Sequence, residues 1–256
     1  MAHPKSVQLH RFLTEPYPCS YLPAQTARLD YRIVAGLRAE DYGALLRRGW
    51  RRFGNQLFRP ACPRCSECRS LRIPVADFRP SRGQRRNPRG NAGVRVVVRR
   101  PTLTPDHLRL YDAYHRDMHR RRGWPLNRIT AEEYEQTFLR GGGEGSREFV
   151  YLRGAQMIGV GLADVVEDAL SSVYFFHAPE WRPAGPGVFS ILEQLRFCRE
   201  QGLRYQYLGY WIPGCPSMSY KSRFRPHEVL VGSPDDHEAP RWIPGAPRSR
   251  GCDDPA

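Results

Sequence analysis

The chain has 256 residues with 40 Lys and Arg against 26 Asp and Glu, and the basic excess lies in residues 1–128, which hold 27 basic and 9 acidic side chains. This charge predicts a polyanionic partner, with nucleic acid ahead of a membrane surface. No run approaches the ~20 apolar residues that cross a bilayer, and the first six residues lack the apolar core of a secretory signal. We therefore expect a cytoplasmic protein with no membrane partner. Hydrophobic residues make up 40% of the chain, which excludes global disorder.

The first 78 residues predict a small N-terminal region. Short strand-like runs occur at 31–34 and 71–75, and a helical pattern runs from 40 to 49, where a glycine ends it. These runs hold too little apolar material for an independent fold. Metal ligation would compensate for a core of this size.

Three of the seven cysteines in this chain predict a metal site. Cys62, Cys65 and Cys68 are each separated by two residues, so a tight turn would bring their thiolates to one ion. A tetrahedral site needs a fourth ligand, for which Cys19 is the first candidate and His10 the second. Zinc and an iron–sulfur cluster both suit this spacing. The alternative is a turn that carries reduced structural cysteines.

The segment 79–100 is an arginine-rich connector with no acidic residue. Its composition predicts a loop at 87–93, followed by a strand at 94–98. Contact with phosphates and a solvated linker are the two interpretations, and the absence of carboxylates favours phosphate contact. The candidates for nucleic-acid contact are Arg79, Arg82, Arg85, Arg86 and Arg89.

Residues 101–232 predict an α+β domain with an acetyltransferase-like (GNAT) mixed sheet. A capped helix spans 104–122, and Thr130 with Glu133 forms a capping box. Three strands at 148–153, 156–166 and 170–177 then form a meander. A glycine-led helix at 187–202, one more strand at 204–211 and a flexible tail at 233–256 follow. Arg182, Gly185 and Gly187 lead into the last helix and resemble the loop with which that fold binds a pyrophosphate. A plain glycine turn before a helix would look the same.

The stretch 205–226 interleaves aromatic and cationic residues. Five aromatic residues lie between positions 205 and 220, and Lys221, Arg223 and Arg225 follow. Such a mixture suits stacking on bases together with neutralisation of phosphates. The alternative is a core strand followed by an exposed cationic turn.

Motifs in both halves resemble one family. Tyr-Leu-Gly-Tyr-Trp-Ile at 207–212 and Met-Ser-Tyr-Lys-Ser-Arg-Phe-Arg-Pro at 218–226 are similar to the C-terminal signature of the arginyltransferase family, the aminoacyl-tRNA–protein transferases of the N-degron pathway. Cys-Ser-Tyr-Leu-Pro at 19–23, the cysteine segment 58–68 and the segment 72–82 resemble the N-terminal region of that family. The similarity covers roughly residues 12–230. Ser217 departs from the pattern, since family members usually carry lysine there.

The resemblance implies an enzyme that takes aminoacyl-tRNA as co-substrate and transfers its amino acid to proteins that begin with Asp or Glu, marking them for degradation. The cysteines at 19 and 62–68 resemble the leucine-transferring branch, whereas Cys215-Pro216 resembles the arginine-transferring branch, so both donors stay open. Tyr210 and Tyr220 are the candidate catalytic residues; His177 and Glu193 are possible general bases.

Six residues are the candidates for substrate binding. An acidic acceptor calls for a cation, for which the candidates are Lys221, Arg223 and Arg225, while Arg182, Gly185 and Gly187 would receive a phosphate of the tRNA 3′ end. Two rival functions share parts of the pattern: an N-acetyltransferase that uses acetyl-CoA, and a metal-stapled RNA-binding protein without catalysis.

Overall fold

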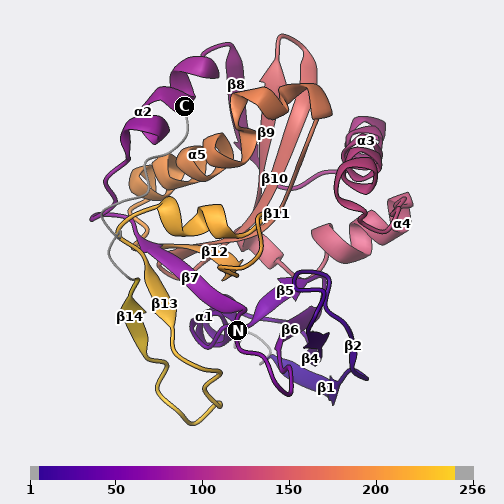
Figure 1. The fold of residues 1–256 in the computed structure, drawn as a ribbon, viewed down its shortest axis with the longest axis vertical. Helices are drawn as coiled ribbons and strands as arrows, with labels where there is room; N and C mark the ends of the chain where they lie inside the picture. Colours follow the sequence, from indigo (N-terminus) through magenta and orange to yellow (C-terminus); the bar gives the residue numbers. More distant parts are fainter. Residues whose placement is uncertain (1–5, 246–256) are drawn as a thin grey trace, which may run out of the picture.

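The computed structural model describes residues 6–245 and arranges them around two main sheets (Figure 1). The larger sheet has eight strands in the order β14-β13-β7-β12-β11-β10-β9-β8. Their bounds are β7 (Arg69–Pro74), β8 (Val94–Arg99), β9 (Ser146–Arg153), β10 (Gln156–Val166), β11 (Ala169–His177), β12 (Tyr205–Trp211), β13 (Glu228–Leu230) and β14 (Trp242–Pro244). The antiparallel meander expected from the sequence is confirmed as β9, β10 and β11.

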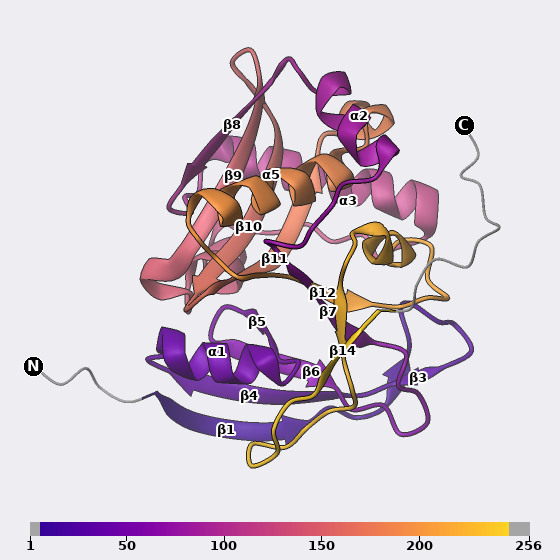
Figure 2. The ribbon, with the colours of Figure 1, turned by 90° about the vertical axis from the view of Figure 1, so that its left-hand side faces the viewer.

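The smaller sheet belongs to the N-terminal part of the chain. Its four strands run in the order β1-β4-β6-β5, with bounds β1 (Val7–Leu13), β4 (Leu29–Ala35), β5 (Arg51–Phe53) and β6 (Gln56–Pro60), beside the two-stranded pair β2 (Tyr17–Pro18) and β3 (Thr26–Ala27). Helix α1 (Ala39–Arg47) packs between the sheets (Figure 2), where Tyr42 and Leu46 join a buried cluster with Val166 and Tyr207 of the larger sheet. The region expected at 1–78 therefore shares a core with the rest of the chain, and its last strand, β7, pairs with β12.

Two long helices cover opposite faces of the meander (Figure 1). Helix α3 (Pro105–Arg122) begins after the cap Thr104 and ends at Gly123, whose φ of 65° is the left-handed stop that glycine adopts without strain. Helix α5 (Pro186–Glu200) confirms the glycine-led helix and buries Ile191, Leu195 and Cys198. Short elements connect these parts: α4 (Ala131–Tyr134), η1 (Glu135–Leu139), η2 (Gly143–Gly145), η3 (Pro179–Ala184) and η4 (Ser219–Arg223). None of the helices within residues 6–245 is long and apolar enough to cross a bilayer.

Two neighbouring strands of the larger sheet run parallel and pair over only part of their length. Strands β11 and β12 pair only between Ala169–Ser171 and Tyr205–Tyr207. Beyond this point β12 carries a bulge between Tyr207 and Gly209, and both strands continue, to His177 and Trp211, without further pairing to each other in the described residues. This is the α+β, acetyltransferase-like arrangement predicted from the sequence. We call the part in which the two strands run unpaired with each other, 172–177 and 208–211, the gap between β11 and β12.

The prediction of a loop at 87–93 is wrong for residues 87–90. Residues Arg82–Gly90 form helix α2, which begins at a capping box between Ser81 and Gln84. Pro88 stands near the end of this short helix, where little regular structure remains for it to interrupt. The capping signal was present in the sequence but was outweighed by the Asn, Pro and Gly content. The strand expected at 94–98 is confirmed as β8.

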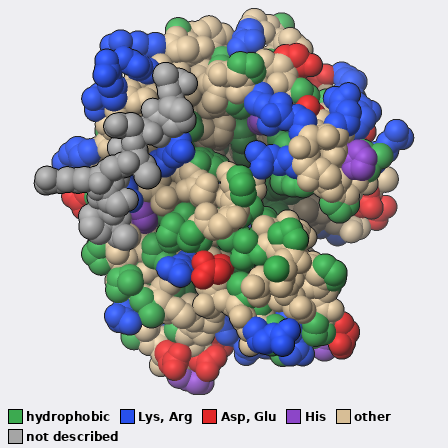
Figure 3. Space-filling model, viewed as in Figure 1, with side chains coloured by type: hydrophobic (Ala, Val, Ile, Leu, Met, Phe, Trp, Pro, Cys, Tyr) green, Lys and Arg blue, Asp and Glu red, His purple; other side chains and the backbone are tan. Residues whose placement is uncertain are grey.

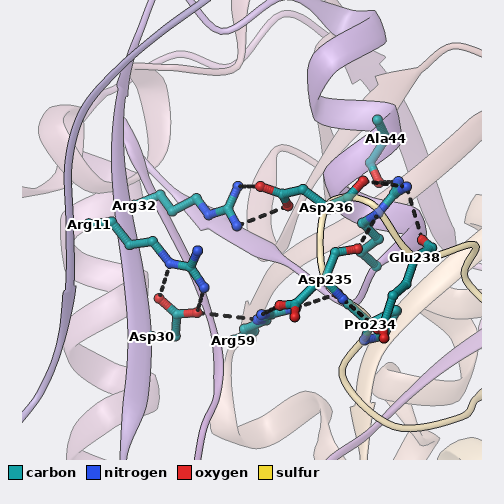
Figure 4. A network of polar contacts seen from close by, with 10 residues as sticks. Arg11, Asp30, Arg32, Ala44, Arg59, Pro234, Asp235, Asp236 and Glu238 are labelled. Atoms are coloured by element: carbon teal, nitrogen blue, oxygen red, sulfur yellow. Dashed lines mark hydrogen bonds and ion pairs between the residues drawn. The ribbon is translucent and has the colours of Figure 1, made fainter.

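The segment expected as a tail from residue 233 is ordered as far as Gly245. Asp236 forms a two-pronged ion pair with Arg32, at 2.9 and 3.0 Å, and Arg59 donates to the carbonyl of Pro234 at 2.8 Å (Figure 4). Strand β14 then extends the larger sheet. Long-range ion pairs with buried arginines fix this segment, and a polar composition gives no sign of them. The rest of the expected tail, 246–256, lies outside the described residues.

Candidate functional site

Helix α5 packs against both β11 and β12, and its start forms the first part of the candidate site. Gly185 caps this helix with a left-handed φ of 66°, and Pro186 and Gly187 open its first turn. Tyr220 of η4 lies against this turn, because a Cβ added at Gly187 would be 3.7 Å from the Tyr220 hydroxyl oxygen. Burial, and then Tyr114, raises the pKa of Tyr220 to about 12, so its hydroxyl is neutral and able to donate a proton. We call this part of the site, made of Arg182, Gly185, Gly187 and Tyr220, the donor end.

Arg182 reaches the donor end from η3. Its guanidinium forms an ion pair with Asp117 of α3 and lies 4.0 Å from the sulfur of Met118. His177 is buried at the end of β11, where its Nδ1 lies 2.8 Å from the carbonyl of Ala178 and burial lowers its pKa. Its ring therefore stays neutral at physiological pH. The other suggested base, Glu193, is held by Arg196 on the same helix at 2.8 Å.

Helix α2 lies beside the donor end. The amide of Asn87 donates to the carbonyls of Ala184 and Gly185, at 3.0 and 3.2 Å, and the amide of Asn91 donates to Ala184 at 3.0 Å. The five arginines predicted for nucleic-acid contact all lie on or just before this helix, and their side chains are mostly exposed. Lys and Arg side chains gather there, at the upper left of the face in Figure 3, and again over α3 at the right. The structure thus places the arginine-rich connector next to the glycine loop.

The second part of the candidate site centres on Lys221, the neighbour of Tyr220. Its ammonium donates to the carbonyl of Tyr210 at 2.8 Å. Burial lowers the pKa of Lys221 to about 7, and the positive charge of Arg51 contributes to that shift. We call this part of the site, made of Lys221, Arg51 and Tyr210, the acceptor end. Adjacent residues of η4 therefore contact the start of α5 and the end of β12.

Tyr210 supports the acceptor end from within. Its hydroxyl lies 2.9 Å from the carbonyl oxygen of Gly49 and 3.2 Å from that of Phe58, so its proton is held by backbone of the N-terminal region. Burial raises the pKa of Tyr210 far above its ordinary range. The side chain that was expected to touch substrate thus ties β12 to the smaller sheet, and its own carbonyl orients Lys221.

Arg223 and Arg225 connect η4 to the arginine-rich segment through their backbone. The carbonyl of Arg223 accepts from the side-chain amide of Gln84 at 3.3 Å, and the carbonyl of Arg225 accepts from the backbone N–H of Arg79 at 3.0 Å. Arg223 is exposed and Arg225 is half-buried. The predicted cationic block and the predicted phosphate-binding segment are therefore neighbours in space.

The four predicted metal ligands share one region without forming a ligand set. Burial raises the pKa of the Cys68 thiol to about 12, and the charges of Cys62, Cys19 and Cys65 contribute to that shift. Within residues 6–245, however, no three His, Cys, Asp or Glu side chains converge closely enough to hold a metal ion. His10 lies on the exposed strand β1.

Two residues of the gap were missed in the sequence. Arg51 lies on the three-residue strand β5, where nothing in the local pattern marks it. Tyr114 of α3 packs against His177, with ring centroids 5.2 Å apart. Tyr114 lies within the helix expected at 104–122, and no sequence signal could have assigned either side chain to the gap.

Comparison with known proteins matches both halves of the chain to a pair of related family models. Residues 17–86 match the family described as "Arginine-tRNA-protein transferase, N terminus", and residues 106–231 match "Arginine-tRNA-protein transferase, C terminus". A Helicobacter hepaticus protein named aspartate/glutamate leucyltransferase is 37% identical over 236 residues, which cover 92% of this chain and 98% of that protein. A Halorhodospira halophila protein of the same name is 40% identical over 224 residues, covering 86% and 93%.

Solved structures give more distant likenesses. FemX is 10% identical, with a TM-score of 0.43 and coverage of 78% of this chain and 79% of that one. The structure of L-PGS from Bacillus licheniformis is 15% identical, with a TM-score of 0.43 and coverage of 57% and 45%. Likeness at this level concerns the course of the backbone alone.

Proposed function

Because this chain belongs to the arginine-tRNA-protein transferase family, we propose that it is an aminoacyl-tRNA–protein transferase that moves leucine from its tRNA to the N-terminal amine of proteins beginning with Asp or Glu. Leucine is chosen over arginine because the two relatives described above are named leucyltransferases. The names of these relatives also give aspartate and glutamate, from which we infer an acceptor that begins with an acidic residue. The reaction draws on charged tRNA, so we expect it to take place in the cytoplasm.

The adjacency of Tyr220 and Lys221 carries the proposal. One side chain lies against the first turn of α5 and the other bonds to the carbonyl of Tyr210. A donor held at α5 and an acceptor held near Lys221 would meet in the gap between β11 and β12. Holding two reactants in one place is the main demand of this reaction, because the aminoacyl ester is already activated.

The transfer needs no covalent enzyme intermediate. The neutral acceptor amine attacks the ester carbonyl carbon, a C–N bond forms and the C–O bond to the tRNA breaks. The proton that the amine nitrogen gives up ends on the departing 3′ oxygen, which leaves as a hydroxyl. Gly185 and Gly187 would admit the terminal phosphate to the start of α5, with Arg182 beside it. Tyr220, whose hydroxyl stays protonated, would donate to the developing negative charge or to the leaving oxygen.

The acceptor arm of the tRNA would follow the exposed arginines of α2. A second basic surface continues along α3, where Arg109, Arg116 and Arg120 line a cavity of about 900 Å³ that also contacts η3. Backbone phosphate contacts of this kind make binding fall steeply with salt. A tRNA affinity that stays flat between low and moderate salt would contradict this interface.

Cys19, Cys62, Cys65 and Cys68 remain candidate ligands for zinc or an iron–sulfur cluster. Their common region supports the proposal, and the absence of a formed ligand set in the described residues weighs against it. Metal analysis and the visible spectrum of protein purified without oxygen decide the question, with Cys65→Ser as the variant that should lose the metal. No step of the proposed transfer depends on a metal or cluster at these cysteines.

The test of the function is one labelling experiment. The protein is incubated with labelled Leu-tRNA, Arg-tRNA or acetyl-CoA and a peptide that begins with Glu. Transfer of label to the peptide from Leu-tRNA supports the proposal. Transfer from Arg-tRNA instead would show that arginine is the donated amino acid, and transfer from acetyl-CoA alone would overturn the proposal. Tyr220→Phe should lower the rate of transfer at saturating substrates by about 100-fold while leaving tRNA affinity unchanged.

A further inference from the structure

Among the described residues, four arginines are buried to more than nine-tenths: Arg32, Arg51, Arg52 and Arg59. Three of them have carboxylate partners, since Arg32 pairs with Asp236, Arg52 with Asp164, and Arg59 with Asp30. Arg51 differs. It is 7% exposed, and no Asp or Glu within residues 6–245 lies within ion-pair distance of it.

The guanidinium of Arg51 is bonded to backbone. Its Nη2 donates to the carbonyl of Ser172 on β11 at 2.9 Å. A guanidinium has five N–H donors, so this bond leaves others for another acceptor. The structure makes room for the group: Gly209, in the bulge of β12, has a φ of 79°, and a Cβ at that position would lie 3.0 Å from Nη2.

A second cation lies beside the first. A Cβ at Gly209 would lie 3.0 Å from the Arg51 guanidinium, and the carbonyl of the next residue, Tyr210, accepts from the Lys221 ammonium at 2.8 Å. The positive charge of Arg51 also contributes to the lowered pKa of Lys221. Burying a charge without a partner is costly, and placing two like charges together raises that cost. Proteins usually avoid such an arrangement unless an anion completes it.

We propose that Arg51 and Lys221 form the site that receives the side-chain carboxylate of the acceptor's N-terminal Asp or Glu. This inference rests on the proposed function and assigns its acceptor specificity to a residue on β5. The geometry favours a carboxylate over a tRNA phosphate. A carboxylate ends a side chain and can enter a nearly closed site, whereas a backbone phosphate continues in two directions and needs an open groove. A guanidinium also matches a carboxylate through two parallel hydrogen bonds.

The experiment compares two peptides that differ only in charge, one beginning with Glu and one with Gln. Wild type, Arg51→Gln, Arg51→Lys and the control Arg147→Gln are assayed at saturating Leu-tRNA. Arg147 also donates to backbone carbonyls, at 2.7 and 2.9 Å, but it is partly exposed at the start of β9. The control therefore removes the same charge from a site outside the gap.

We expect Arg51→Gln to lower kcat/KM for the Glu peptide by about 10- to 100-fold, mainly through KM, as for a lost hydrogen bond to a charged group. The kcat/KM for the Gln peptide and the KM for Leu-tRNA should stay as in wild type. Arg51→Lys should restore part of the preference for the Glu peptide over the Gln peptide. An equal loss for both peptides would show that Arg51 only supports the fold. A rise in the KM for Leu-tRNA would show that the site holds a phosphate. Either result overturns the proposal.

A binding measurement separates this inference from the proposed function. Calorimetry without tRNA should show that wild type binds the Glu peptide more tightly than the Gln peptide, and that Arg51→Gln loses the difference. If wild type shows this preference but transfers no amino acid, the proposed function fails and the carboxylate site stands. If it transfers leucine to both peptides equally, the function stands and the site fails. The urea midpoint of each variant confirms that it is folded.

Discussion

The ion pair between Arg52 and Asp164 should be the main anchor between the two sheets. Arg52 of β5 donates to both carboxylate oxygens of Asp164 on β10, with distances of 2.8 to 3.0 Å, and each side chain is 2% exposed. Ser146 donates to the same carboxylate at 2.9 Å. Water cannot replace Asp164 at this depth, so Asp164→Ala leaves an uncompensated buried charge.

The expected cost of Asp164→Ala is about 3–5 kcal/mol, the range for breaking a buried pair from one side. The lower end applies here, because Arg52 keeps its bonds to the carbonyls of Gly54 and Arg140, at 2.9 and 2.7 Å. Domains are usually stable by about 5–15 kcal/mol, so this change removes a large part of the total. With an m-value of about 3 kcal/mol per molar urea, the midpoint should fall by about 1 M.

Urea unfolding of Asp164→Ala, Arg52→Met and the double variant measures this directly. The double-mutant cycle should show a coupling of about 2 kcal/mol or more, because the second change removes the charge that the first left unpaired. Glu200→Ala is the matched control: it breaks a pair with Arg196 whose side chains are 53% and 57% exposed, and should cost under about 1 kcal/mol. A loss below about 1 kcal/mol for Asp164→Ala, or an additive cycle, would refute the anchor.

Three further changes test other parts of the molecule. Gly185→Ala places a side chain at a φ of 66° and should cost about 1–2 kcal/mol while raising the KM for aminoacyl-tRNA; an unchanged KM would contradict the donor end. Hydrogen bonds from Arg32 hold the pKa of Asp236 below its usual range, so the pair stabilises the folded state fully above about pH 4 and loses that effect as the pH falls through the folded pKa. Asp236→Asn should thus lower the free energy of unfolding, and with it the urea midpoint, at neutral pH but not in strong acid. The loss should be at most about 1 kcal/mol, because the carboxylate is 47% exposed. A midpoint loss that persists in strong acid would contradict this account. The exposed arginines Arg82, Arg86 and Arg89 of α2 can be replaced together with glutamine. This should reduce the salt slope of tRNA binding by about 0.7–0.9 for each arginine that neutralises a phosphate, whereas an unchanged slope would place the interface elsewhere.

Several parts of the site could be predicted because their signals are local. The glycine turn before α5, the cap of α3 and the alternation in the meander each depend on neighbours within a few residues. Helix α2 was missed although its capping box is also local, because the Asn, Pro and Gly content of 87–93 predicted a loop. The ordered segment up to Gly245 could not be predicted, since Asp236 meets Arg32, a partner far earlier in the chain.

The sequence by itself determined the family, the order of the elements and the concentration of positive charge in residues 1–128. Only the tertiary structure decided which buried cations meet a carboxylate. Arg51 and Arg52 are identical residues next to each other in the sequence, yet Arg52 pairs with Asp164 whereas Arg51 donates to the carbonyl of Ser172. The reason is that neighbouring side chains of a strand point to opposite faces, so their partners come from distant parts of the chain. The fold, rather than any motif, thus placed in the gap between β11 and β12 a buried arginine that has no carboxylate partner within residues 6–245.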